Sequence, residues 1–271
     1  MVIDESELIY GELSYEKRIV AFFDILGWKN EIDTAGTDSR HIARLASVLR
    51  LFSAFKNRIG DADARIATFS DNVVFSKRYS EGDIAWLLEG LATTQLGAAA
   101  SGFWIRGGVT VGEIYHDEHV VFGPALNQAY RLESLKAKFP RIILDSAALP
   151  IPDGTDFICF EEDCFLDPFK PQFWDRIQKQ HPIDQDIIDE FSTLSGTDIP
   201  VEPVLYNGTT ILMSIIQRLN HELTTIEDPR AWSKLAWLFD RIAIVLGTNI
   251  SASMLPKSAA LNNREQKQRA G

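Results

Sequence analysis

The chain has 271 residues, of which 45% are hydrophobic and 24% are charged, as in an ordinary globular protein with a sizeable core. Its formal net charge of −11 makes nucleic acids and anionic membranes poor partners, because their phosphates would be repelled. No apolar run approaches the roughly 20 residues needed to span a bilayer.

The N-terminal segment 1–10 is acidic and lacks a signal-peptide pattern, so we expect a cytoplasmic protein. The chain has two cysteines, Cys159 and Cys164, which are too few for a disulfide framework or a cysteine-rich zinc site. We expect both to be free thiols in a reducing compartment.

Hydrophobic periodicity and turn residues predict alternating strands and helices up to residue 150. In chain order these are a buried strand over 18–25, a helix over 40–58 capped by Asp38 and Ser39, strands over 64–69 and 73–76 joined by the turn 70–72, a helix over 81–100, a strand pair over 103–112 and 113–122, a helix from Pro124 to about 137, and a short strand over 141–144. This order predicts an α/β (α+β) sandwich: a mainly antiparallel sheet with helices on one face.

The composition changes after residue 149, where prolines interrupt the chain. We expect loops, short strands and a short helix near 184–194, followed by helices over about 208–224 and 229–247. The predicted organisation is a first domain over 1–150, a C-terminal extension over 151–261 and a flexible tail over 262–271.

Two acidic residues, Asp24 and Asp71, follow apolar strand-like runs. If the two strands are neighbours, the two carboxylates repel each other unless a cation lies between them. Hard oxygen ligands suit Mg²⁺ or Mn²⁺, and these ions commonly accompany nucleotide phosphates. The pair therefore indicates phosphoryl-transfer chemistry.

Four segments in order resemble the catalytic domain of class III nucleotide cyclases, over about residues 15–150. They are residues 22–28 (FFDILGW), 69–72 (FSDN), 106–113 (RGGVTVGE) and 122–134 (FGPALNQAYRLES). The resemblance implies a cyclase palm: a mainly antiparallel sheet with helices, here followed by a C-terminal helical extension.

The resemblance also implies the roles of individual residues. Asp24, Asp71 and the backbone carbonyl of Ile25 would hold two divalent cations, Mg²⁺ or Mn²⁺. Asn127 would orient the ribose and Arg131 would stabilise the charged transition state. The substrate phosphates would bind at the first of the four segments, through Phe23, Ile25, Leu26, Gly27, Trp28 and Lys29.

In this family each active site lies across a dimer interface, with the aspartates from one subunit and the asparagine and arginine from the other. The chain has both sets of residues, so the resemblance implies a homodimer with two equivalent sites. The residue that holds the terminal phosphates has no clear match. Its candidates are Lys29, Lys136, Lys138 and Arg141.

The positions where purine cyclases read the base are Ala67 and Val120 here, and neither side chain can hydrogen-bond a base edge. This departure is similar to the bacterial pyrimidine cyclases of the Pycsar antiphage systems. The resemblance implies conversion of UTP, or CTP, to cyclic UMP or cyclic CMP, which would activate a downstream effector. UTP is favoured, although no residue here establishes it over CTP.

Taken singly, the same residues have simpler interpretations. Asp24 could cap a helix, Asp71 could be an ordinary hairpin residue, and Arg131 could form a surface pair with Glu133. His116 and His119 could bind a metal, but a solvated turn is favoured there.

Two other functions stay open. One is an adenylate or guanylate cyclase with atypical base readers, and the other is an inactive cyclase-like protein that binds nucleotide or serves as a scaffold. A diguanylate cyclase is excluded by the missing signature of that family.

Overall fold

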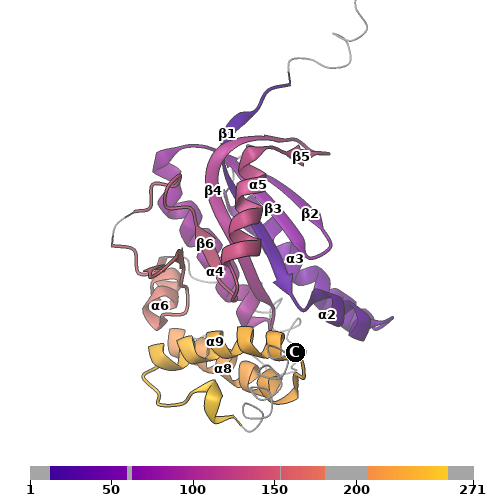
Figure 1. Cartoon of the computed structure of the whole chain (residues 1–271), viewed down its shortest axis with the longest axis vertical. Coiled ribbons are helices and arrows are strands. Elements are labelled where there is room, and N and C mark those ends of the chain that lie inside the picture. The colour runs from indigo at the N-terminus through magenta and orange to yellow at the C-terminus, as the bar shows by residue number, and fades with distance from the viewer. Residues whose placement is uncertain (1–12, 60–62, 153, 181–206, 256–271) are drawn as a thin grey trace, which may run out of the picture.

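The computed structural model describes residues 13–59, 63–152, 154–180 and 207–255 (Figure 1). Its centre is an eight-stranded sheet with the order β2-β3-β1-β4-β6-β8-β7, and β5 pairs with β4. The strands are β1 (Glu16–Leu26), β2 (Arg65–Phe69), β3 (Asn72–Arg78), β4 (Trp104–His116), β5 (Val121–Phe122), β6 (Ile142–Leu144), β7 (Ile158–Phe160) and β8 (Cys164–Leu166). Only the pairing of β4 with β6 is parallel within the described sheet. The predicted mixed α/β fold with a mainly antiparallel sheet is confirmed.

Helices cover both faces of the sheet, whereas the sequence predicted one (Figure 1). The described helices are α2 (Trp28–Ala35), α3 (Ser39–Ile59), η1 (Glu81–Asp83), α4 (Ile84–Ala100), α5 (Pro124–Arg131), the π-helical turn η2 (Leu132–Lys136), α6 (Pro171–Gln180), α8 (Gly208–Thr225), α9 (Pro229–Val245) and η4 (Ala252–Met254). On β1, Phe23 and Ile25 belong to the main core under α3 and α4, while Val20 and Phe22 pack under α5. Successive strand residues point to opposite faces, so each residue of β1 is assigned to one layer.

Most predicted elements before residue 100 are confirmed. Asp38 caps α3 by accepting a hydrogen bond from the Arg40 backbone N–H at 2.9 Å. The β2–β3 hairpin turns at Ser70 and Asp71, and Ser70 adopts a left-handed φ of 56°.

The predicted strand pair over 103–112 and 113–122 is wrong. Residues 104–116 form one continuous strand, β4, and the chain turns only after His116. The Asp117 carboxylate makes this turn by accepting the backbone N–H groups of His119 and Val120 at 2.7 and 2.8 Å. His116 is buried against Ser76 at 2.8 Å, so the solvated turn favoured for this histidine is also wrong.

Beyond residue 150, β8 and β7 extend the same sheet, and helix α6 was not predicted. Helices α8 and α9 agree with the sequence prediction, and Cys159 and Cys164 are free thiols. The predicted helix near 184–194 and the tail 262–271 lie outside the described residues. The domain boundary near residue 150 stays a prediction.

The part of the chain that the structure describes contains no helix that is both long enough and apolar enough to cross a membrane.

Gly108 lets α5 and η2 lie directly on β4, and Gly107 lets Phe23 of β1 pack closely on the other side. A Cβ on Gly108 would lie 2.4 Å from the Ala129 carbonyl oxygen and 2.6 Å from the Leu132 Cβ. The pairing of β4 with β1 runs without interruption through both glycines, so they permit close approach and form no bulge.

We expect Gly108→Ala to lower the free energy of unfolding by about 1–3 kcal/mol, because the new methyl group overlaps backbone atoms that cannot move freely. Gly82→Ala is the matched control, since its Cβ would meet only the Ser80 hydroxyl at 4.0 Å. Urea denaturation measures both values. Equal stability of the two variants would contradict the close approach of η2 to β4.

Candidate active site

The sheet brings Asp24 and Asp71 to the same end of two paired strands. In the strand registers, Asp24 lies opposite Asn72 of β3 and Arg106 of β4. Asp71 occupies the β2–β3 turn, and its backbone carbonyl accepts the Ile25 N–H at 3.2 Å. The segment that carries Asp24 is therefore hydrogen-bonded directly to the turn that carries Asp71.

The Asp24 side chain lies on the same face of β1 as Val20 and Phe22, which is the face under α5. It is 15% exposed, so it is partly shielded from water but can be reached. A carboxylate in this setting needs a cationic partner.

Arg106 is that partner in the structure. Its Nε donates a hydrogen bond to Asp24 Oδ2 at 2.6 Å and lies 2.8 Å from Glu133 Oε1. The second contact is an ion pair without hydrogen-bond geometry, because Glu133 Oε1 has no hydrogen-bond donor. One guanidinium is thus shared between two carboxylates.

Glu133 is buried, so the alternative of a surface pair with Arg131 is wrong. From Leu132 the helix widens into the π-helical turn η2, and Leu132 and the Glu133 backbone lie against Gly108 of β4. The Glu133 side chain is 3% exposed and faces Arg106. Sequence reasoning missed this contact, although Glu133 lies four residues after the buried Ala129 and therefore shares its helix face.

Burial raises the pKa of the Glu133 carboxyl above its usual value of 4.5. Arg106 acts in the opposite direction, Asp24 and Asp71 raise the pKa further, and Lys234 of α9 lowers it. These mutual effects mean that the three acids, the arginine and the lysine form one electrostatic cluster.

The segment that follows β1 has the features of an anion-binding turn. Gly27 adopts a φ of 79° and precedes α2, and no side chain within the described ranges caps this helix. The first N–H groups of α2 are therefore available to an anion. The side chains of Phe23 and Trp28 are buried, so these two residues can offer only backbone groups to a ligand, while Lys29 is exposed.

Asn127 and Arg131 lie on the exposed side of α5, because Ala125 and Ala129 face the sheet. Among the described residues, neither side chain hydrogen-bonds or forms an ion pair with Asp24. The described contacts therefore join the predicted catalytic pair to neither of the predicted metal ligands within one chain.

The remaining predicted residues are spread over the molecule. Ala67 lies on the edge strand β2, and Val120 is exposed in the turn between β4 and β5. Of the candidates for the terminal phosphates, Lys136 and Arg141 pair with Asp163 at 3.5 and 2.9 Å, beside β7 and β8.

The donor set at Asp24 and Asp71 suits a hard cation, since it offers carboxylate oxygens and the adjacent Ile25 carbonyl. Over the described ranges, no three His, Cys, Asp or Glu side chains are grouped as a metal ion would need. A cation here would rest on two side chains and on ligands from the backbone and the substrate.

No family model matches the chain, and neither does any curated protein. Two solved structures of a bacterial light-regulated adenylyl cyclase are similar, each at 13% identity. The alignment with the first structure covers 58% of this chain and 53% of the first structure's chain, with a TM-score of 0.43. The alignment with the second structure covers 57% of this chain and 91% of the second structure's chain, with a TM-score of 0.40. The chain thus spans about half the length of the first structure, and at these scores the likeness carries no functional argument by itself.

We expect Glu133→Gln to change the pH dependence of stability. The raised pKa means that folded protein binds more protons than unfolded protein, so the wild-type free energy of unfolding falls as pH rises from the ordinary value of 4.5 through the raised one. The glutamine variant loses this decline, and its stability relative to wild type grows over the same window.

Urea denaturation at a series of pH values between 4 and 8 measures the effect. Glu162→Gln, an exposed acid next to β8, is the control and should follow the wild-type curve. If the free energies of unfolding of Glu133→Gln and wild type vary with pH in the same way, the raised pKa of Glu133 is contradicted.

Proposed function

We propose that the chain is a nucleotide cyclase that converts a pyrimidine nucleoside triphosphate to its 3′,5′-cyclic monophosphate and pyrophosphate. The observation that carries this proposal is the hydrogen bond from Ile25 N–H to the Asp71 carbonyl, which holds two acids beside an uncapped helix start. Carboxylates next to free backbone N–H groups suit a metal-bound polyphosphate.

In the proposed reaction the ribose 3′-oxygen attacks the α-phosphorus, its proton leaves, and the bond to pyrophosphate breaks. Asp24, Asp71 and the Ile25 carbonyl would hold two divalent cations. When bound, these cations would lower the pKa of the 3′-hydroxyl and neutralise the leaving group. The backbone of the turn from Ile25 to Lys29 would bind the phosphates through N–H groups other than that of Ile25, which donates to Asp71. Arg131 would supply fixed positive charge to the transition state.

The exposed positions of Asn127 and Arg131 support a site shared between two subunits. Both side chains are free to meet a partner's acids, and apolar residues surround the regions that would meet. Phe69, two residues before Asp71, is 82% exposed, and Tyr130, next to Arg131, is 52% exposed. A symmetric dimer would cover such residues and complete two equivalent sites.

The choice of a pyrimidine rests on Ala67 and Val120. Neither side chain can hydrogen-bond a purine base. The site therefore has no polar side chain at these positions that would favour a purine over a smaller base. We favour UTP, with CTP as the alternative, and a cyclic nucleotide that signals to an effector in antiphage defence.

The pairing of Arg106 with Asp24 supports a second candidate. The guanidinium already neutralises one of the two predicted metal ligands. A nucleotide-binding protein without cyclase activity would keep this pair, whereas an active cyclase must let Asp24 share its oxygens with a cation.

We expect the purified protein, incubated with all four nucleoside triphosphates and Mn²⁺, to release a cyclic pyrimidine nucleotide identified by mass. Asp71→Asn should lower the rate more than about 100-fold, because it removes a metal ligand. Glu162→Gln is the control and should leave the rate unchanged. A cyclic purine product would overturn the pyrimidine assignment, and bound nucleotide without any product would favour the second candidate.

We also expect Asp24→Ala and Arg131→Ala, each inactive alone, to regain activity when mixed, because a heterodimer contains one intact shared site. A quarter of the wild-type rate is the rough expectation if subunits exchange freely, since half of the dimers are mixed and each has one of two sites. Subunit exchange is verified by differently tagged chains. Full exchange without recovered activity would refute the shared site.

A further inference from the structure

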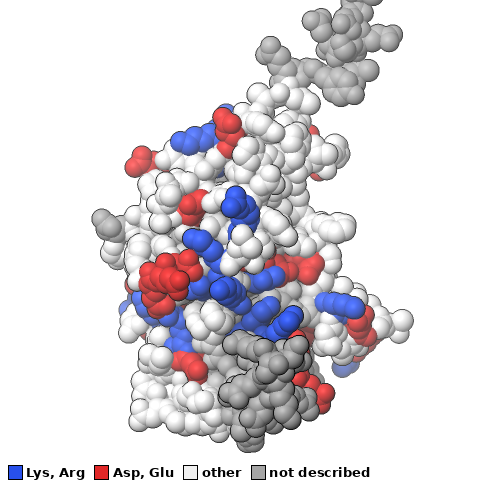
Figure 2. Space-filling view, in the orientation of Figure 1, with Lys and Arg blue, Asp and Glu red and all other residues white. Residues whose placement is uncertain are grey.

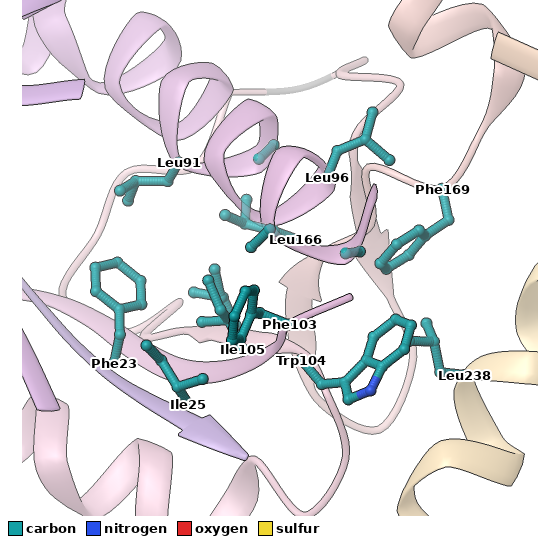
Figure 3. Packing of buried hydrophobic residues seen from close by; sticks show 14 of the residues in the cluster. Phe23, Ile25, Leu91, Leu96, Phe103, Trp104, Ile105, Leu166, Phe169 and Leu238 are labelled. Atoms are coloured by element: carbon teal, nitrogen blue, oxygen red, sulfur yellow. The ribbon is translucent and has the colours of Figure 1, made fainter. Parts of the chain in front are cut away.

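The helices on the two faces of the sheet are held by very different amounts of apolar packing. The face under α3 and α4 carries the main core, in which Phe23 and Ile105 of the strands lie across from Leu91 of α4 (Figure 3). The buried apolar cluster under α5 is much smaller, and its buried members in the described chain are Val20, Ile114, Ala125 and Ala129. Helix α5 therefore gains little of its orientation from apolar burial.

Helix α5 is short, and the residues on its inner side are small. It spans eight residues, no described side chain caps its start at Gly123, and Ala125 and Ala129 face the sheet. Contacts of alanine methyl groups have no preferred direction, so they allow the helix to rotate at low cost. The outer side of α5 is exposed, and Lys and Arg side chains gather on the surface between α5 and α9 (Figure 2). The orientation of α5 thus depends on directional contacts beneath it.

Asp145 supplies such a contact. Its Oδ2 accepts a hydrogen bond from Nε2 of Gln128 on α5 at 3.0 Å and another from Oγ1 of Thr110 on β4 at 2.8 Å. Among the residues that the structure describes, the bond from Gln128 is the only side-chain hydrogen bond that joins α5 to another part of the chain. Thr110 is buried, so its hydroxyl depends on Asp145 for a partner. One carboxylate oxygen therefore links the helix to the central strand.

The backbone holds Asp145 itself in place. The residue follows β6, its N–H donates to the Val109 carbonyl at 2.9 Å, and its carbonyl accepts the N–H groups of Ala148 and Leu149 at 3.0 and 2.8 Å. With the bond from Thr110, Asp145 is fixed to β4 through both its backbone and its side chain. A carboxylate anchored in this way is a rigid reference point for the helix above it.

The bond at Gln128 fixes the directions in which its neighbours on α5 project. Gln128 follows Asn127 and precedes Arg131 by three residues, and successive residues of an α-helix project about 100° apart. A helix with its side chains is about 10–12 Å across, so a rotation of about 20° would move a side-chain tip by about 2 Å. A displacement of about 1 Å at a reacting group can already cost about 100-fold in rate. Fixing Gln128 therefore matters for any chemistry of Asn127 and Arg131.

We infer that Asp145 is a positioning residue, which acts through Gln128 to hold Asn127 and Arg131 in the orientation that cyclisation needs. This inference rests on the proposed function, because it assumes that these two side chains meet the substrate at the shared site. The proposed phosphate-binding turn after Asp24 belongs to other elements. Loss of the bond should therefore slow the chemical step and leave substrate binding nearly unchanged.

The test is steady-state kinetics with Mn²⁺ and the triphosphate that the wild-type protein cyclises, taken from UTP, CTP, ATP and GTP. We expect Gln128→Met, which keeps the length of the side chain but cannot donate, to lower kcat about tenfold or more with KM changed less than about twofold. Asp145→Ala should do the same, and Asp145→Asn, which keeps an acceptor oxygen, should recover most of the rate. Gln217→Met, at an exposed position of α8, is the matched control and should change nothing.

A double-mutant cycle separates positioning from a general loss of structure. If Asp145 acts through Gln128, Asp145→Ala should cost little further kcat in the Gln128→Met background. Losses that multiply, or a loss confined to KM, would overturn the inference. Urea denaturation checks that each variant folds, and should Asp145→Ala fail, Gln128→Met and Asp145→Asn still decide. A normal kcat for Gln128→Met beside an active wild type would overturn the inference alone. A wild-type protein that yields no cyclic product from any triphosphate would overturn the proposed function as well.

Discussion

The candidate site depends on the register in which β1 pairs with its two neighbours. This register sets Asp24 between Asn72 and Arg106, and it sends Asp24 to the face under α5. A slip by one residue would turn Asp24 into the core under α3 and α4, where Phe23 and Ile25 are buried. A carboxylate in that core would cost several kcal/mol, so the same alternation that builds the core also fixes the acid.

Once Asp24 is fixed, charge balance shapes what surrounds it. A single guanidinium, from Arg106, serves two carboxylates, and burial raises the pKa of Glu133. Removing one member of a buried ion pair commonly destabilises a protein by about 3–5 kcal/mol, so these residues constrain one another. The ion pairs of Arg106 therefore hold the charge cluster together within the chain.

Much of the fold could be predicted from the sequence, since local signals decide it. The apolar run of β1, the cap at Asp38 and the turn at Ser70 and Asp71 are all local. The break predicted near residue 112 failed, because Gly107 and Gly108 serve close packing inside a continuous strand. For the site, the sequence indicated Asp24 and Asp71 but missed Arg106, Glu133 and Lys234. Arg106 meets the acids through strand register and Lys234 lies on a distant helix, and local periodicity shows neither. Glu133 lies four residues after the buried Ala129, so helical spacing could have placed it on the buried face.

The central claim is that Asp24 and Asp71 together hold divalent cations beside a nucleotide. Electron paramagnetic resonance of Mn²⁺ titrated into the protein with 3′-deoxy-UTP counts the bound ions directly. The account predicts two Mn²⁺ ions for each nucleotide in the wild-type protein, with weakened binding in both Asp24→Asn and Asp71→Asn. Binding of Mn²⁺ that is unchanged in both variants would contradict it.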